Sequence, residues 1–166
     1  TVVDEAKRID AALVGLGMPM GPFALTDMIG LDVAAKVAEI LYDSFGPRMS
    51  PASLLNDLVK AGRLGAKSGA GVFGYDDRAG NPLPQMVVEI QKRTGIRGTG
   101  CTPHRLMMPM VNEAVICLQE GVATAADIDI AMMAGTGFPQ DKGGPLHYVD
   151  QLGLDVVLAE LDRFTR

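Results

Sequence analysis

The chain has 166 residues, of which 48% are hydrophobic, and its formal net charge is −5 at pH 7. This length and apolar content suffice for one compact domain or for two small halves that share a core. The acidic balance argues against a nucleic-acid surface, and no apolar run approaches the ~20 residues of a membrane span. Two cysteines without a signal-like start indicate a reducing compartment rather than a disulfide scaffold.

The first part of the chain predicts helices separated by glycine and proline. Apolar residues recur at helical spacing within residues 4–16, and a rigid turn leads from there into a short helix over residues 23–29. Asp32 is expected to cap a third helix. The expected buried face of that helix carries Val33, Val37, Ile40 and Leu41.

A glycine-rich stretch separates the next two predicted helices. Ser50 and Pro51 are expected to begin the fourth helix, with the serine as its cap and the proline in its first turn. Residues 62–78 lack a helical period, which predicts a structured loop or a short extended segment. A helix over residues 85–94 follows, and residues 95–100 are expected to form a flexible link.

Caps are also predicted for the later helices. Thr102 and Pro103 fit the cap and first-turn positions of a helix that extends to residue 120. Thr124 and Asp127 resemble a capping box for the next helix, which is expected to end at Gly135. The apolar stripe of the first of these two helices comprises Met107, Met110, Val111, Ala114, Val115 and Leu118.

Thirteen residues of this chain occur twice. Residues 21–33 and 144–156 share seven identical positions, and the dipeptide at Ile9 and Asp10 also returns at residues 128–129. The offset of 123 (144 − 21) is too long for a solenoid repeat and indicates a tandem duplication of one helical subdomain. Asp155 is expected to cap the last helix. The residues expected to face inward there are Leu158, Leu161 and Phe164.

The two copies differ at their beginnings. A long helix over residues 106–120 precedes the second copy, whereas only residues 1–4 lie in front of the first helix. We therefore predict a fragment of a longer protein, in which a preceding helix covers an apolar face of the first copy. The expected organisation is a first repeat at residues 1–78, truncated at its N-terminus, a connecting helix and linker at residues 79–100, and a second repeat at residues 101–166.

The residue patterns by themselves predict neither a catalytic pair nor a metal site. Residues 69–74 match G-x-G-x-x-G, but their neighbours do not form the strand and helix that a dinucleotide fold requires. Cys101 and His104 have no second ligand pair, and His147 is expected to have a structural role. The ten methionines favour adaptable core packing over a fatty-ligand pocket. Lys67 lies in a tight glycine loop, where it is either a phosphate contact or a solvated lysine.

Several motifs carry a family resemblance. GMPMGPFALTDMIGLDV (residues 17–33) and GAKSGAGVFGY (65–75) resemble the C-terminal helical domain of L-3-hydroxyacyl-CoA dehydrogenases. NEAVICLQEG (112–121), GTGFP (135–139) and GGP (143–145) are similar to the second such domain of multifunctional fatty-acid oxidation proteins. The resemblance implies an all-α fold with two tandem copies of a helical dehydrogenase C-terminal domain, like that of 6-phosphogluconate dehydrogenase. Internal pairing of the copies would then replace the dimer contact of single-copy relatives.

The same resemblance implies a function. The parent protein is expected to be an NAD-dependent 3-hydroxyacyl-CoA dehydrogenase that forms 3-ketoacyl-CoA in fatty-acid β-oxidation. In the family, NAD and the catalytic His–Glu pair belong mainly to a Rossmann domain that this sequence lacks, so we expect no catalytic residue here and no activity of the fragment alone. By resemblance, Lys67 reaches toward the cofactor and Ala134 lies near the substrate. His104 and Arg105 stand where first copies have Asn-Arg, so the second copy is expected to be a structural partner.

The implied partners are the acyl-CoA substrate and the Rossmann domain of the same parent chain, with a hydratase domain and thiolase subunits as further candidates. The implied location is a bacterial cytoplasm, or the mitochondrion or peroxisome in a eukaryote. Two alternatives stay open: a non-catalytic docking scaffold, and the helical domain of a different β-hydroxyacid dehydrogenase acting on a small free acid. An upstream Rossmann sequence would exclude the scaffold, and binding of CoA thioesters by the parent would exclude the free-acid enzyme.

Overall fold

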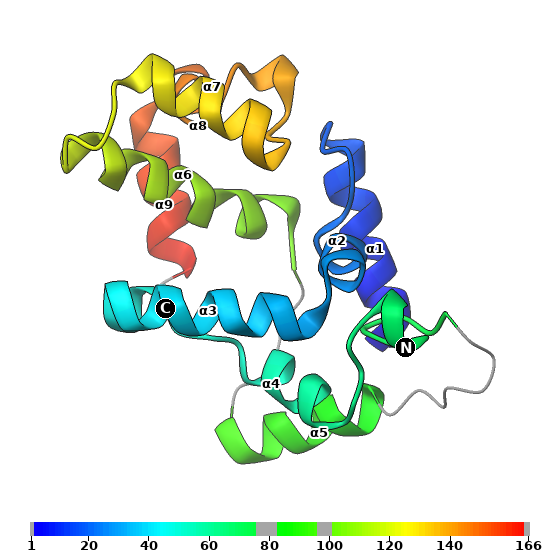
Figure 1. Cartoon of the computed structure of the whole chain (residues 1–166). Helices are drawn as coiled ribbons and strands as arrows, with labels where there is room; N and C mark the ends of the chain where they lie inside the picture. Colours follow the sequence, from blue (N-terminus) through cyan, green and yellow to red (C-terminus); the bar gives the residue numbers. More distant parts are fainter. Residues whose placement is uncertain (1, 76–82, 96–100, 165–166) are drawn as a thin grey trace. The chain divides into compact units, whose positions relative to one another are not determined.

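The computed structural model describes residues 2–75, 83–95 and 101–164, which form helices joined by short turns (Figure 1). The all-α prediction is confirmed, since these residues contain isolated β-bridges but no strand. The chain divides into two compact units. Unit 1 comprises Thr1–Ala11 and Met20–Thr99, and unit 2 comprises Ala12–Pro19 and Gly100–Arg166.

The predicted helices near residues 4–16, 23–29 and 85–94 are confirmed as α1, α2 and α5. The fourth helix begins at Ser53 and not at Ser50, because the Ser50 hydroxyl donates a hydrogen bond of 3.0 Å to the Pro47 carbonyl and so closes the preceding 3-10 turn. The elements in this part of the chain are α1 (Val2–Gly15), α2 (Pro22–Ile29), α3 (Leu31–Phe45), η1 (Gly46–Met49), α4 (Ser53–Lys60), η2 (Ala66–Ser68) and α5 (Leu83–Thr94).

The core of unit 1 brings α1, α3, α4 and α5 together with the glycine-rich loop. Its buried members are Ala6, Leu31, Leu58, Val72 and Leu83. Full burial of a leucine side chain contributes about 1.5–3 kcal/mol relative to exposure, so the three leucines dominate this small core. The loop is therefore part of the hydrophobic core and not an appendage to it.

The prediction for the buried face of α3 is wrong. Leu31 and Ala35 are buried, whereas the four predicted residues, Val33, Val37, Ile40 and Leu41, are between 36% and 54% exposed. Apolar residues cover more than half of the circumference of α3, so the helical period alone could not select which part of that surface this chain covers.

Unit 2 contains the predicted capped helices. Thr102 Oγ1 accepts the N–H of Arg105 at 3.2 Å, and Thr124 Oγ1 accepts the N–H of Asp127 at 3.3 Å, which confirms both predicted caps. The elements are α6 (Pro103–Gln119), α7 (Ala125–Thr136), η3 (Gln140–Lys142), α8 (Pro145–Leu152) and α9 (Leu154–Phe164).

Two other predicted caps are wrong. Asp32 and Asp155 lie inside the first turns of α3 and α9, and the cap position of α3 is taken by Gly30. A carboxylate in a first turn still favours the helix through the helix dipole, by about 0.3–1 kcal/mol. Of the predicted inward residues of α9, Leu158 is 51% exposed, and its neighbour Val157 is buried instead. The side chain of Phe164 lies outside the described residues.

The core of unit 2 includes residues from α1. Leu13 is 4% exposed and lies in this core, with Leu16 and Met18 packed beside it. The other buried members are Met107, Met108, Val111, Phe138, Tyr148 and Val157. Because Ala6 belongs to the core of unit 1, helix α1 contributes side chains to both cores.

The duplication reappears as a capping arrangement at the start of α2. Its N-cap residue, Gly21, has no side chain that could cap the helix. Instead, the two oxygens of the Asp10 carboxylate accept the N–H groups of Phe23 and Ala24, each at 2.9 Å. A Cβ atom on Gly21 would lie 2.3 Å from the Cβ of Asp10, so this close approach requires glycine.

The same arrangement occurs at the start of α8. The Asp129 carboxylate accepts the N–H of Leu146 at 2.7 Å and that of His147 at 3.1 Å. A Cβ atom on Gly144 would lie 2.3 Å from the Cβ of Asp129. Asp10 and Asp129 are thus equivalent in structure as well as in sequence, and α1 is the counterpart of α7.

We expect Asp129→Ala to lower the free energy of unfolding by about 1–2 kcal/mol, because two N–H groups at the start of α8 lose their acceptor. Asp129→Asn should recover part of this loss, since one amide oxygen can still accept. Urea denaturation of the purified variants measures the effect, with Asp155→Ala as the control for removing an exposed charge. Equal stability of Asp129→Ala and the unchanged chain would contradict the assigned cap.

Candidate functional site

The glycine-rich loop of residues 62–75 carries Lys67 and is held to α2 by one buried carboxylate. Asp27 is 0% exposed, and its Oδ1 accepts the N–H of Val72 at 2.7 Å while its Oδ2 accepts the N–H of Phe73 at 2.9 Å. Hydrogen bonds to a charged group contribute about 1.5–3 kcal/mol each, roughly twice as much as neutral ones. Asp27 therefore fixes the position of the loop.

Two glycines of the loop are required by this contact. A Cβ atom on Gly71 would lie 2.0 Å from the Asp27 Oδ1, and one on Gly65 would lie 2.1 Å from the Asp27 backbone oxygen. Isolated bridges join Gly65 to Ala70 and Ala70 to Gly74, and no helix begins at the described end of the loop. The G-x-G-x-x-G pattern thus reflects packing against Asp27 and does not form the strand-to-helix turn of a dinucleotide fold.

Arg63 stabilises the loop through hydrogen bonds from a buried side chain. Its side chain is buried, its Nε donates to the Gly71 carbonyl at 2.7 Å, and its Nη2 donates to the Phe73 carbonyl at 3.4 Å. Burial lowers the pKa of the guanidinium, and the charge of Asp27 opposes that change. The sequence pattern does not predict the role of Arg63. The sequence does single out Asp27, because this aspartate is one of the seven positions that are identical in the two copies of the repeat.

Lys67 projects from η2 to the beginning of α3. Its Nζ lies 2.5 Å from Oδ1 of Asp32, and both side chains are nearly half exposed. The hydrogen bond from Lys67 is the main reason why the pKa of Asp32 is lowered. An ion pair at such an exposed position contributes only about 0–1 kcal/mol to stability. The ammonium group can therefore exchange Asp32 for another anion at small cost.

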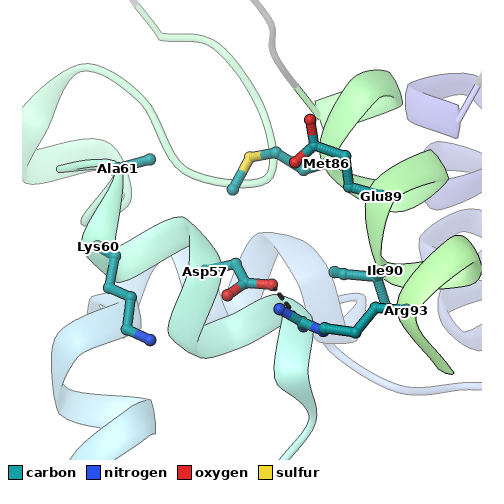
Figure 2. Close-up of a pocket in the computed structure, with 7 residues that line it drawn as sticks. All are labelled: Asp57, Lys60, Ala61, Met86, Glu89, Ile90 and Arg93. Carbon is teal, nitrogen blue, oxygen red and sulfur yellow. Dashed lines mark hydrogen bonds and ion pairs between the residues drawn. The ribbon is translucent and has the colours of Figure 1, made fainter.

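Two open grooves flank α4. One groove of about 460 Å³ lies between α3 and α4, and its charged residues are Asp32, Lys36, Glu39 and Lys60. The other groove has a volume of about 310 Å³ and lies between α4 and α5. There, Nη2 of Arg93 lies 3.0 Å from Oδ2 of Asp57, the ion pair that Figure 2 marks with a dashed line. Acidic and basic side chains are equal in number along each groove, so neither has the excess positive charge that selects a phosphate.

Tyr75 ends the described part of the loop, and its N–H donates to the Gly69 carbonyl at 2.8 Å. Burial, the negative charge of Asp27 and a hydrogen bond to that carboxylate raise the pKa of Tyr75 to about 12. The neutral phenol is therefore favoured by folding.

Stability should decrease between about pH 10 and pH 12, because the unfolded chain releases the Tyr75 proton at the lower pH and the folded chain retains it. Phenolate absorbance should show one of the three tyrosines titrating late. In Tyr75→Phe, the late titration and the matching part of the stability loss should both disappear. A late titration that survives this substitution would assign the shift to another tyrosine.

The other predicted site residue, Ala134, is exposed near the end of α7 and offers only a methyl group. It belongs to unit 2, whereas Lys67 belongs to unit 1. Among the residues that the structure describes, no group of three or more metal-ligating side chains comes together. Over the same residues, no helix is both long enough and apolar enough to cross a membrane.

The chain matches a known family along most of its length. The family model described as 3-hydroxyacyl-CoA dehydrogenase, C-terminal domain, matches residues 3–75 and 100–166. The fatty acid oxidation complex subunit alpha of Vibrio cholerae is 36% identical over 165 residues, which cover 98% of this chain and 23% of that protein. The protein of the same name from Shewanella sp. (strain MR-4) is 36% identical over 95% of this chain and 23% of its own length.

A solved structure shares the fold. The crystal structure of 3-hydroxybutyryl-CoA dehydrogenase from Escherichia coli K12 aligns with a TM-score of 0.75 and 24% identity, over 96% of this chain and 50% of that one. The curated relatives are much longer than this chain, which spans about a quarter of their length. The two segments matched by the family model also contain the two copies of the duplicated motif. The chain therefore belongs to the family of the C-terminal domain of 3-hydroxyacyl-CoA dehydrogenases.

Proposed function

We propose that this chain is the helical part of an NAD-dependent 3-hydroxyacyl-CoA dehydrogenase, and that it closes the acyl-CoA cleft against a Rossmann domain of the same parent chain. The reaction is the transfer of a hydride from the 3-hydroxyacyl-CoA to NAD, with release of the hydroxyl proton, to give 3-ketoacyl-CoA. The observation that supports this proposal is the family match over both repeats, residues 3–75 and 100–166. We assign the hydride transfer and proton abstraction to the part of the parent outside this chain.

The described residues do not fit NAD as a whole, because the glycine pattern of the loop packs on Asp27 and forms no pyrophosphate turn. The contribution that we propose for this chain is a single cationic contact from Lys67. The loop that carries Lys67 is fixed by Asp27, and the partner of the Lys67 ammonium group among the described residues is the partly exposed carboxylate of Asp32. We assign Ala134 a separate role, as a small apolar contact near the acyl-CoA.

The parent is proposed to act in a bacterial cytoplasm, as part of fatty-acid β-oxidation. The Vibrio and Shewanella relatives are named as subunits of a fatty acid oxidation complex, which supports a larger assembly for the parent as well. A hydratase domain and thiolase subunits are the partners that we propose for that assembly.

The test is NADH oxidation with acetoacetyl-CoA by three proteins: this chain alone, the upstream Rossmann part alone, and the continuous parent. Only the continuous parent should turn over. Turnover by this chain alone would contradict the proposal that the catalytic groups lie in the upstream part. No turnover by the continuous parent would favour the non-catalytic docking scaffold. If the parent reduces a short free keto acid and not the CoA thioester, the free-acid enzyme is correct.

The role of Lys67 is tested in the continuous parent. Lys67→Gln should raise the KM for NAD by about fivefold, the equivalent of a lost interaction of about 1 kcal/mol, with little change in kcat. The matched control is Lys36→Gln, which removes another exposed lysine paired with a carboxylate, Glu39, at 3.1 Å. An unchanged KM for NAD in Lys67→Gln would contradict the proposed cofactor contact and would leave Lys67 only the role of a surface ion-pair partner.

A further inference from the structure

The ion pair between Lys67 and Asp32 joins the glycine-rich loop to the first turn of α3. The Lys67 Nζ donates a hydrogen bond to Oδ1 of Asp32 across 35 residues of sequence. Their side chains are 47% and 40% exposed, so water and dissolved anions reach both charged groups. Exposed ion pairs are weak, because solvent screens the charges and because the long side chains lose rotamer freedom. The pair is therefore a contact that a stronger anion can replace.

The second copy of the repeat has no such pair. Asp155 is the counterpart of Asp32 and lies in the first turn of α9, but the described residues provide no basic partner for it. A Cβ atom on Gly30 would lie 2.9 Å from Asp32 Oδ1 and 3.0 Å from Lys67 Nζ. A Cβ atom on Gly153, the counterpart of Gly30, would have no heavy atom within 4 Å. The ion pair thus occupies a space that is specific to unit 1.

The backbone on both sides of Lys67 is held in place. The Ser68 hydroxyl accepts the N–H of Leu64 at 2.9 Å and lies 2.9 Å from the carbonyl oxygen of Ala70. The contacts of Asp27 described above hold the following part of the loop. Rotations within the lysine side chain are therefore sufficient to carry the ammonium group from one anion to another, and exposed side chains make such rotations in picoseconds to nanoseconds.

The charge of Asp32 does not depend on the lysine alone. Besides the hydrogen bond from Lys67, the N–H groups of Val33 and of Asp32 itself contribute to the lowered pKa of this carboxyl group. The first turn of a helix also favours a negative charge. Asp32 therefore stays an anion when the lysine leaves, and it remains within reach of the ammonium group.

We propose that Asp32 is a positioning residue that competes with a bound phosphate group for the Lys67 ammonium group, and that it thereby weakens the binding of the cofactor. The proposal rests on the cationic contact that the proposed function assigns to Lys67. Binding of a phosphate group exchanges one anionic partner of the lysine for another, so the loss of the ion pair offsets part of the attraction. Removal of the Asp32 charge should therefore strengthen binding.

A carboxylate beside a lysine can also orient that lysine toward a ligand. Orientation and competition predict opposite results, because loss of the Asp32 charge weakens binding in the first case and strengthens it in the second. The exposure of both side chains favours competition, since a weak contact with solvent on both sides does little to fix the direction of the ammonium group.

The test measures NAD binding to the continuous parent by calorimetry. Asp32→Asn retains the shape of the side chain and one oxygen that can accept the first-turn N–H groups. It should lower the Kd for NAD by about threefold, as expected for a weak exposed pair, and it should change the Tm by less than about 2 °C. In the Lys67→Gln background, the same substitution should change the Kd by less than about 1.5-fold. Asp155→Asn is the matched control and should leave the Kd unchanged.

The outcomes separate this proposal from the proposed function. An unchanged or higher Kd in Asp32→Asn, or an equal decrease in both backgrounds, would overturn the competition. If Lys67→Gln leaves the Kd for NAD unchanged, the cofactor contact of the proposed function is wrong. Because CoA also carries phosphate groups, the same variants are titrated with acetoacetyl-CoA. An effect of Asp32→Asn on that Kd alone would support the competition and assign Lys67 to the substrate.

A carboxyl titration followed by NMR tests the ion pair in the 166-residue chain without any ligand. The hydrogen bond from Lys67 is the largest cause of the lowered pKa of Asp32, so Lys67→Gln should raise this pKa toward its ordinary value. Lys36→Gln is the control, because Lys36 lies one turn along α3 from Asp32 and pairs with Glu39, and its effect should be smaller. An Asp32 pKa that does not respond to Lys67→Gln would overturn the proposal.

Discussion

Asp27→Ala is expected to lower the free energy of unfolding of unit 1 by about 3–5 kcal/mol, a large fraction of the 5–15 kcal/mol typical of a small domain. The reason is the loss of both oxygens that accept the N–H groups of Val72 and Phe73 at 2.7 and 2.9 Å, in a place with no access to water. Val72 is a member of the unit 1 core, so release of the loop also exposes apolar surface.

The duplication supplies the control for this substitution. Asp150 is the counterpart of Asp27 in the second copy and is exposed, so Asp150→Ala should change stability by less than about 0.5 kcal/mol. The loss of stability in Asp27→Asn should lie between those of the two alanine variants, because the amide oxygen can accept only one of the two N–H groups. Denaturant unfolding of the three variants measures the order. Equal effects of Asp27→Ala and Asp150→Ala would show that the loop is held by its other contacts.

Leu13→Ala is expected to destabilise unit 2 by about 2–4 kcal/mol, although Leu13 lies some ninety residues before α6 in the sequence. Its side chain is 4% exposed and lies in the cluster that contains Met107 and Val111 of α6. Truncation leaves a cavity between α1 and the second repeat. The suitable measurement is hydrogen exchange of the α6 amides, combined with denaturant unfolding.

Val14→Ala is the matched control, because this neighbouring residue on α1 is 49% exposed and belongs to neither core cluster. Its effect should be within about 0.5 kcal/mol, and α6 exchange should be unchanged. If Leu13→Ala accelerates exchange only within residues 2–11 and 20–75, the assignment of this leucine to unit 2 is wrong.

Local signals in the sequence predict most of the fold. The periodicity of apolar residues predicts the helices, and the hydroxyls of Thr102 and Thr124 cap α6 and α7 as predicted. These features depend on residues within one turn of each other, so sequence is sufficient. The family and the duplication follow from motif order, which the family match to residues 3–75 and 100–166 confirms.

The remaining features depend on contacts that are distant in sequence. Asp27 meets its partners 45 and 46 residues later, and no local pattern predicts that pairing. Asp32 satisfies the sequence rule for a cap, but Gly30 takes the cap position and the aspartate pairs with Lys67, 35 residues away. The prediction of the buried face of α3 was wrong for another reason. An apolar surface on a helix predicts burial, but it does not show which element of the structure buries it. The roles of Lys67 and Ala134 stay predictions.

Helix α1 has a consequence for how such a duplicated protein can evolve and be divided. Leu13 belongs to the core of unit 2, although the helix that carries it lies in the first repeat, so the second repeat is not self-contained. A recombination breakpoint between the repeats, anywhere from Gly95 to Cys101, leaves the second repeat without Leu13 and Met18. Melting of α1 would remove one side chain from each of the two hydrophobic cores.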